Sequence, residues 1–128
     1  MRTVLITDDS KTSQMLVKTT LSRISELEFL TAENGKEALA VMEKRHVDLL
    51  ITDINMPEMD GIALVRAVRL QHDARALPIL IITAKGEETA REEGLALGAN
   101  AYVLKPLSTR DLADQASRLL GPKLNTPH

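Results

Sequence analysis

Five short apolar runs alternate along the chain with longer segments in which apolar residues recur every three or four positions. Short apolar runs are typical of buried strands, and the wider spacing is typical of a helix with one face against a core. The predicted strands cover residues 4–7, 28–32, 47–53, 78–83 and 101–105. Helical patterns lie between these strands and after the last one, which indicates an α/β domain with a parallel sheet.

The composition of the strands predicts their order in the sheet. Residues 4–7, 47–53 and 78–83 are nearly continuous apolar runs, as expected where helices cover both faces of a strand. The second and fifth strands include polar residues such as Glu28 and Lys105, so they are better candidates for the edges. We therefore predict a flavodoxin-like, doubly wound sheet of five parallel strands in the order 2-1-3-4-5, with five helices.

The helix predicted at about residues 87–97 differs from the other four. Its apolar stripe consists only of Ala90, Gly94 and Leu97, and the segment is rich in Glu and Arg. We expect it to be the least firmly packed helix of the domain, because helices in proteins are stabilised mainly by burying an apolar face.

Composition narrows the class of protein. The chain has 128 residues, of which 44% are hydrophobic and 27% charged, which fits one ordinary soluble domain. A net charge of -2 argues against direct binding of nucleic acid or of a membrane surface. The absence of cysteine excludes disulfides and thiolate metal sites, and no apolar run approaches the roughly 20 residues of a membrane span. We predict a cytoplasmic protein with one domain at residues 1–121, followed by a tail or the start of a linker at 122–128.

Polar residues gather where the predicted strands end. Asp8 and Asp9 follow the first strand, and Asp53 ends the third. Thr83 ends the fourth strand, and Lys105 ends the fifth. Ligands of doubly wound sheets bind at the carboxyl ends of the strands, so we expect these five side chains to line one site.

Three neighbouring carboxylates require a cation or a shared proton. At about 4 Å and an effective dielectric constant near 20, each pair of like charges costs on the order of 4 kcal/mol. Hard oxygen ligands favour Mg²⁺, which binds one or two carboxylates, several waters and a phosphate oxygen. Zinc is disfavoured, because these loops contain neither His nor Cys.

Each of these residues also has a purely structural interpretation. The aspartates could cap the helix or turn that follows them, and Thr83 could be an ordinary β-branched strand residue. Lys105, which precedes Pro106, could be an exposed turn lysine; a cis bond would instead aim its side chain inward. The occurrence of all five at one edge of the sheet favours the site.

Several motifs together resemble the receiver domains of two-component response regulators, and in particular single-domain, chemotaxis-type regulators. In chain order, the motifs are Asp8-Asp9, Asp53-Ile54-Asn55-Met56-Pro57 with Asp60-Gly61, Thr83-Ala84, Gly98-Ala99, and Tyr102-Val103-Leu104-Lys105-Pro106. The resemblance spans about residues 3–120 and adds roles for individual residues to the analysis above.

By this resemblance, Asp53 is the phosphoacceptor, and it takes its phosphoryl group from a sensor histidine kinase or a histidine phosphotransfer protein. The side chains of Asp8, Asp9 and Asp53, with the main-chain carbonyl of Asn55, hold Mg²⁺, or Mn²⁺ in its place. The resemblance thus implies magnesium-dependent phosphoryl transfer to an aspartate.

The same resemblance implies a switch. Lys105 contacts the phosphoryl group, Thr83 moves to bond it, and Tyr102 changes rotamer as Thr83 moves; alternatively, Tyr102 is only an amphipathic edge-strand residue. The neighbours of the phosphate site are Ala84, Lys85 and Pro106. A downstream target protein binds the face formed by the helix at 87–97, the fifth strand and the final helix, and the protein is a monomer or a phosphorylation-dependent dimer.

Three classes of function remain open. The first is a phosphorylation-switched signalling module, and the second is a magnesium-dependent phosphatase of the aspartyl-phosphate type. Such phosphatases carry a second acid two residues after the nucleophile, where this chain has Asn55. The third is a receiver-like module that binds partners without phosphorylation. The complete set of acids, threonine and lysine argues against this third class, since a degenerate module would be expected to lose one of them. We therefore expect a signalling switch rather than an enzyme, either stand-alone or as the N-terminal piece of a longer protein.

Overall fold

The computed structural model describes residues 1–121, and the predicted tail at 122–128 lies outside the described residues. The strands are β1 (Arg2–Thr7), β2 (Leu27–Ala32), β3 (Leu49–Asp53), β4 (Ile79–Thr83) and β5 (Ala101–Leu104). The helices are α1 (Lys11–Leu21), α2 (Gly35–Lys44), α3 (Gly61–Arg69), α4 (Glu88–Leu97) and α5 (Thr109–Leu120). Each strand except β5 is followed by a helix that returns the chain to the start of the next strand, and α5 follows β5.

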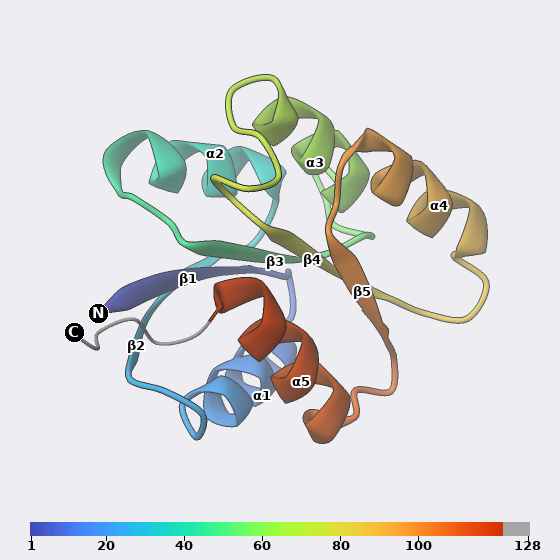
Figure 1. Ribbon diagram of the computed structural model, residues 1–128. Helices are drawn as coiled ribbons and strands as arrows, with labels where there is room; N and C mark the ends of the chain where they lie inside the picture. Colours follow the sequence, from blue (N-terminus) through green and yellow to red (C-terminus); the bar gives the residue numbers. More distant parts are fainter. Residues whose placement is uncertain (122–128) are drawn as a thin grey trace.

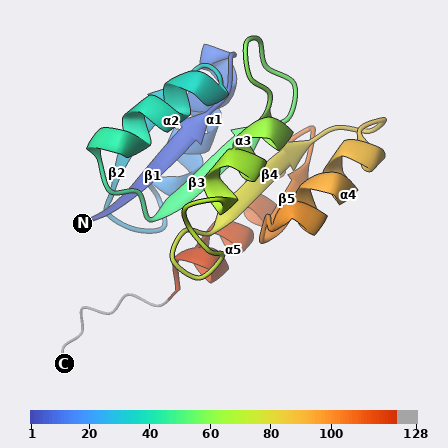
Figure 2. The same cartoon turned by 90° about the horizontal axis from the view of Figure 1, so that it is seen from above.

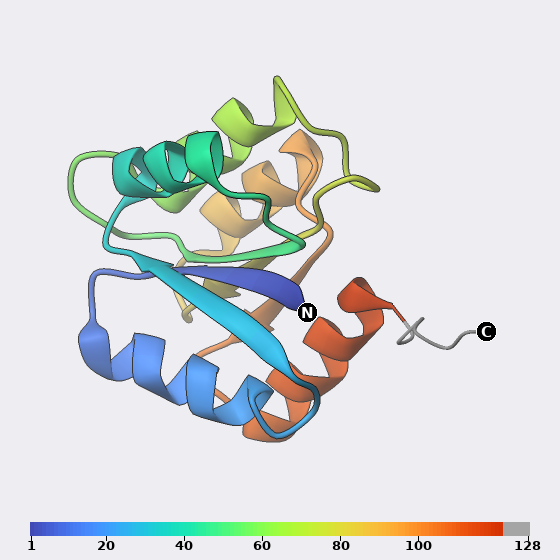
Figure 3. The same ribbon diagram turned by 90° about the vertical axis from the view of Figure 1, so that its left-hand side faces the viewer.

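The sheet contains five parallel strands in the order β2-β1-β3-β4-β5, which confirms the predicted order. It forms the middle of three layers, with α2, α3 and α4 on one face and α1 and α5 on the other (Figures 1 and 3). The edge strands β2 and β5 are only partly buried, whereas β3 and β4 are buried throughout, as their composition indicated.

Alternation along the strands divides the core into two halves. Successive strand residues point to opposite faces of a sheet. Leu5, Leu50 and Ile81 belong to the core half beneath α2, α3 and α4, while Ile6 and Ile51 belong to the half beneath α1 and α5. The inner strands therefore need apolar residues at nearly every position, because both of their faces are covered.

Four of the five helices begin at a capping side chain. Ser10, Asn34, Asp60 and Ser108 precede α1, α2, α3 and α5, and each accepts a hydrogen bond from the backbone N–H three residues later. Such caps satisfy N–H groups that have no partner within the helix. Glu87 precedes α4, and its side chain makes no capping hydrogen bond.

The packing of α4 agrees with the expectation from its composition. Gly94 is its one buried residue, and a Cβ atom at this position would lie 2.6 Å from Cδ1 of Ile81 on β4. α4 thus approaches the sheet closely at Gly94, and Ala90 and Leu97 are partly buried against the same core. Viewed from above, α2, α3 and α4 follow one another across the sheet, with α4 over its β5 end (Figure 2). Within residues 1–121, no helix is both long and apolar enough to cross a bilayer.

Candidate functional site

The three predicted carboxylates meet at the carboxyl edge of the sheet. Thr7 pairs with Thr52 across β1 and β3, so the residues that follow, Asp8 and Asp53, lie beside each other. One carboxylate oxygen from each of Asp8, Asp9 and Asp53 can be chosen so that all three atoms lie within 4.8 Å of one another. Asp8 and Asp53 are only 2% and 4% exposed, whereas Asp9 is exposed.

Asp8 holds its charge in an unfavourable position. Its Oδ1 accepts a hydrogen bond of 2.9 Å from the backbone N–H of Ser10, but among residues 1–121 its buried Oδ2 has no partner. Burial raises the pKa of Asp8, the negative charges of Asp53 and Asp9 raise it further, and the Ser10 bond and Lys105 only partly oppose this. A hard divalent cation would supply the missing partner, and this all-oxygen donor set suits Mg²⁺.

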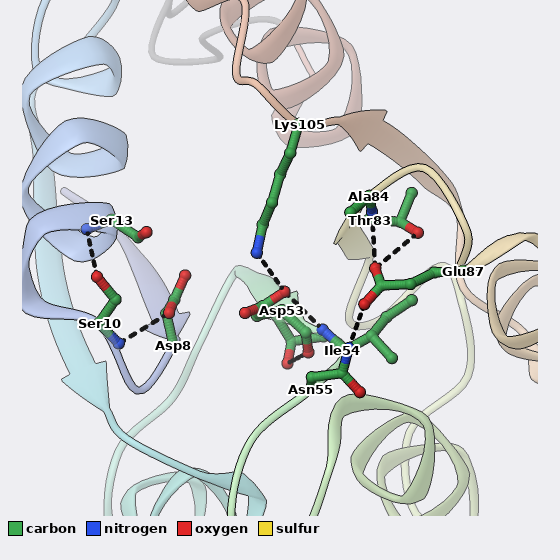
Figure 4. Close-up of polar contacts among 11 residues, drawn as sticks. Asp8, Ser10, Ser13, Asp53, Ile54, Asn55, Thr83, Ala84, Glu87 and Lys105 are labelled. Carbon is green, nitrogen blue, oxygen red and sulfur yellow. Dashed lines mark hydrogen bonds and ion pairs between the residues drawn. The ribbon is translucent and has the colours of Figure 1, made fainter.

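Lys105 provides the positive charge of the site. Its Nζ lies 3.0 Å from Oδ1 of Asp53 (Figure 4), and the Lys105–Pro106 peptide bond is cis. Burial lowers the pKa of Lys105, but the hydrogen bond to Asp53 and the charges of Asp53, Asp8 and Glu87 outweigh this, so the pKa is raised overall. Lys105 lies just beyond β5, where its N–H donates to the carbonyl of Thr83 at 2.8 Å.

The loop after Asp53 depends on a glycine. The N–H of Ile54 donates to Oδ1 of Asp53 at 2.9 Å, and the N–H of Gly61 donates to the carbonyl of Ile54 at 2.8 Å. A Cβ atom at Gly61 would lie only 2.0 Å from the main-chain oxygen of Asp53. Glycine therefore allows α3 to begin directly against the loop that positions Asp53.

The fourth strand brings Thr83 to the same edge, where its partner is a residue that the sequence analysis missed. The Thr83 hydroxyl donates to Oε1 of Glu87 at 3.2 Å, and the N–H of Ala84 donates to the same oxygen at 2.7 Å. The side-chain amide of Asn55 donates to Oε2 of Glu87. Figure 4 shows the Glu87 carboxylate among these donors, with Asp53 and Lys105 beside them. An acidic residue at the start of a helix is ordinarily explained by its favourable interaction with the helix terminus. The sequence therefore carries no signal that Glu87 contacts the site.

Tyr102 lies outside the carboxylate cluster. It pairs with Ile81, two residues before Thr83, and packs against the core half beneath α2, α3 and α4. The guanidinium carbon of Arg91 on α4 lies 4.6 Å from the centre of its ring, a cation–π contact. Lys85, the residue after Ala84, is exposed.

The sequence matches the family model for the response regulator receiver domain over residues 4–117. The chain belongs to this family. The receiver domain is 37% identical over 119 residues to a chemotaxis protein CheY homolog of Campylobacter jejuni, covering 92% of each chain. It is 39% identical over 109 residues to a probable transcriptional regulator ycf27 of Galdieria sulphuraria, covering 85% of this chain and 41% of that protein.

Solved structures agree with the sequence comparison. The receiver domain superposes on the chemotaxis response regulator CheY4 of Vibrio cholerae with a TM-score of 0.82 and 37% identity, covering 93% of this chain and 98% of that one. Receiver domains of this family act in two-component signalling, where they interact with histidine kinases and downstream targets, and they are signalling proteins rather than conventional enzymes. They generally bind Mg²⁺ at an acidic pocket, and in this chain Asp8, Asp9 and Asp53 form an acidic cluster at the carboxyl edge of the sheet.

Proposed function

We propose that residues 1–121 are a cytoplasmic receiver that is activated by phosphorylation of Asp53 and then binds a downstream target through α4, β5 and α5. The observation that carries the proposal is the buried Asp53, held by Lys105 at 3.0 Å and flanked by Asp8, whose buried Oδ2 has no partner within residues 1–121. A buried nucleophile, a cation and an acidic metal pocket together are the parts that phosphoryl transfer requires.

The side chains of Asp8, Asp9 and Asp53 and the main-chain carbonyl of Asn55 would hold Mg²⁺, or Mn²⁺ in its place. Bound there, the ion would neutralise the carboxylates and the charge that builds up on the phosphoryl oxygens during transfer. Asp8 and Asp9 would form no bond to the phosphoryl group; their role would be to hold the ion beside Asp53.

Asp53 then acts as the nucleophile. One of its carboxylate oxygens attacks the phosphorus of a phosphohistidine on a sensor histidine kinase or phosphotransfer protein. The O–P bond forms as the P–N bond breaks. The electron pair of the P–N bond passes to the ring nitrogen, and the imidazole, already protonated on its other nitrogen, leaves as the neutral ring. Lys105 stabilises the phosphoryl oxygens, and the Thr83 hydroxyl and the Ala84 N–H donate to them. Attack of water on the phosphorus later releases phosphate and restores the carboxylate.

Movement of Thr83 toward the phosphoryl group couples this chemistry to the output face. Tyr102 on β5 and Arg91 on α4 are in contact, so a shift at the end of β4 can reach both elements. α4 buries only Gly94, and weakly packed elements are the ones that can rearrange at low cost. Activation would then change target affinity, or join two receivers as a dimer.

Intact-mass measurement with Mg²⁺ and a small-molecule phosphodonor tests the proposal. We expect the mass of one phosphoryl group to be added to the wild-type chain, and the adduct to be lost in Asp53→Asn and without Mg²⁺. Asp114→Asn on the exposed face of α5 removes the same charge and should leave the adduct intact. Failure of the wild-type chain to gain the adduct with Mg²⁺ present would favour a receiver-like module that binds partners without phosphorylation.

A further inference from the structure

Glu87 accepts hydrogen bonds from three groups, which belong to the last residue of β4, the residue after it, and the loop after Asp53. Oε1 accepts from the Thr83 hydroxyl and the Ala84 N–H at 3.2 and 2.7 Å, and Oε2 accepts from the Asn55 amide. We call this set of contacts the Glu87 bridge. It connects the residue before α4 to the end of β4 and to the loop after Asp53.

The Glu87 side chain forms its hydrogen bonds with residues of the site and does not cap its own helix. The residues that precede α1, α2, α3 and α5 all cap their helices, whereas Glu87 makes no capping hydrogen bond. The carboxylate instead turns back toward Thr83 and Asn55 (Figure 4). The Glu87 side chain thus supplies no cap to α4, and its carboxylate serves as an acceptor in the site instead.

Two of the donors in the Glu87 bridge are those that the proposed function gives to the phosphoryl group. A hydroxyl and a backbone N–H each donate a single hydrogen, so the Thr83 hydroxyl and the Ala84 N–H cannot serve two anions at full strength. A carboxylate and a phosphoryl group that share the same donors are also close enough for their negative charges to repel each other. A phosphoryl group on Asp53 must therefore displace Glu87 before it can use these donors.

We propose that Glu87 is the internal occupant of the phosphoryl-binding donors, that it slows phosphorylation of Asp53, and that its displacement releases the start of α4. This inference rests on the proposed function and names the residue through which the site acts on α4. Glu87 is a positioning residue, because it holds Thr83, Ala84 and Asn55 and takes no part in the transfer. Because Gly94 is the one buried residue of α4, little apolar packing would hold the start of the helix in place once Glu87 is displaced.

The first test compares rates of phosphorylation. Glu87→Gln keeps the shape of the side chain without the charge, Glu87→Ala removes the acceptor, and Glu88→Gln is the matched control. Glu88 carries the same charge one residue later, and its carboxylate contacts the N–H of Gly86 at 3.2 Å. With Mg²⁺ and phosphoramidate, both Glu87 variants should form the Asp53 adduct about three to ten times faster than wild type, the range for the net contribution of one ordinary hydrogen bond. Glu88→Gln should match wild type.

The second test follows hydrogen exchange of the amides of residues 91–94, which begin the hydrogen-bonded part of α4. Before phosphorylation, these amides should exchange faster in Glu87→Ala than in wild type or Glu88→Gln. On phosphorylation, wild type should approach the rate of the variant, while the variant changes little. This readout separates release of α4 from a general loss of stability, which would raise exchange in every element.

The outcomes separate the two proposals. Equal phosphorylation rates and equal α4 exchange in wild type and both Glu87 variants would overturn the role of Glu87 and leave the proposed function standing. Slower phosphorylation of the Glu87 variants would also overturn it, because Glu87 would then assist the transfer. Absence of the adduct from every protein, wild type included, would overturn the proposed function and the role of Glu87 with it.

Discussion

α3 and α4 lie side by side on one face of the sheet, and each begins next to a loop of the site, but they are held in place differently. α3 buries five residues, Gly61, Ile62, Leu64, Val65 and Val68. α4 buries Gly94 alone, and the residue before it is tied to the site through the Glu87 bridge. α3 is anchored by these five buried residues, whereas α4 meets the apolar core with Gly94 and the partly buried Ala90 and Leu97, and the residue before it makes polar contacts with the site.

The two kinds of anchor respond differently to chemistry at the site. Burial of a leucine or valine side chain contributes about 1.5 to 3 kcal/mol whatever occupies the carboxylate pocket. A hydrogen bond to a hydroxyl or an N–H lasts only until a stronger acceptor takes the donor. Under the proposed function, α3 would therefore keep the loop after Asp53 in position through a phosphorylation cycle, while α4 would be able to respond to it.

Truncating one leucine in each helix should give the largest difference. Leu64 is fully buried, so Leu64→Ala should lower the free energy of unfolding by about 2 to 5 kcal/mol. Leu97 on α4 is only partly buried, and Leu97→Ala should cost about 1 kcal/mol. Urea denaturation followed by circular dichroism measures both. Equal losses would mean that α4 is anchored by the core as firmly as α3, and would break the comparison.

Alanine substitutions at Gly61 of α3 and Gly94 of α4 should give a smaller difference in the free energy of unfolding. Gly61→Ala places a Cβ atom against the main-chain oxygen of Asp53, which cannot yield without moving the site, so a loss of about 1 to 3 kcal/mol is expected. Its phosphorylation by the small-molecule donor should slow as well.

The Cβ atom of Gly94→Ala meets the ends of two buried side chains, Cδ1 of Ile81 and of Ile62, rather than backbone, and alanine favours the helix by about 1 kcal/mol, which offsets part of the cost of moving them. The net change in the free energy of unfolding should therefore stay within about 1 kcal/mol, again measured by urea denaturation. A larger loss for Gly94→Ala than for Gly61→Ala would place the rigid contact at α4.

The sequence could predict the fold and the carboxylate cluster because both depend on regular rules. Nearly continuous apolar runs identify the three inner strands, and polar residues within a run identify the two edge strands. Because the strands are parallel, their carboxyl ends bring Asp8, Asp53 and Lys105 to one edge of the sheet. The Glu87 bridge depends on one side chain turning away from its helix. The same residue at the same position would ordinarily favour the helix terminus, so the pattern alone could not separate the two roles.

The contact between Arg91 and Tyr102 should give the smallest effect, and it tests how α4 is joined to β5. Arg91→Ala removes a cation–π contact worth about 0.5 to 1 kcal/mol. Tyr102 is the one tyrosine in a chain without tryptophan, so its fluorescence reports this site directly. Arg66→Ala is the matched control, because it removes the same charge and a partly exposed ion pair with Glu93 at 3.2 Å, between α3 and α4. We expect a changed Tyr102 signal in Arg91→Ala and none in Arg66→Ala. An unchanged signal in both would mean that β5 and the core hold the ring without Arg91, leaving the Glu87 bridge as the contact through which the site acts on α4.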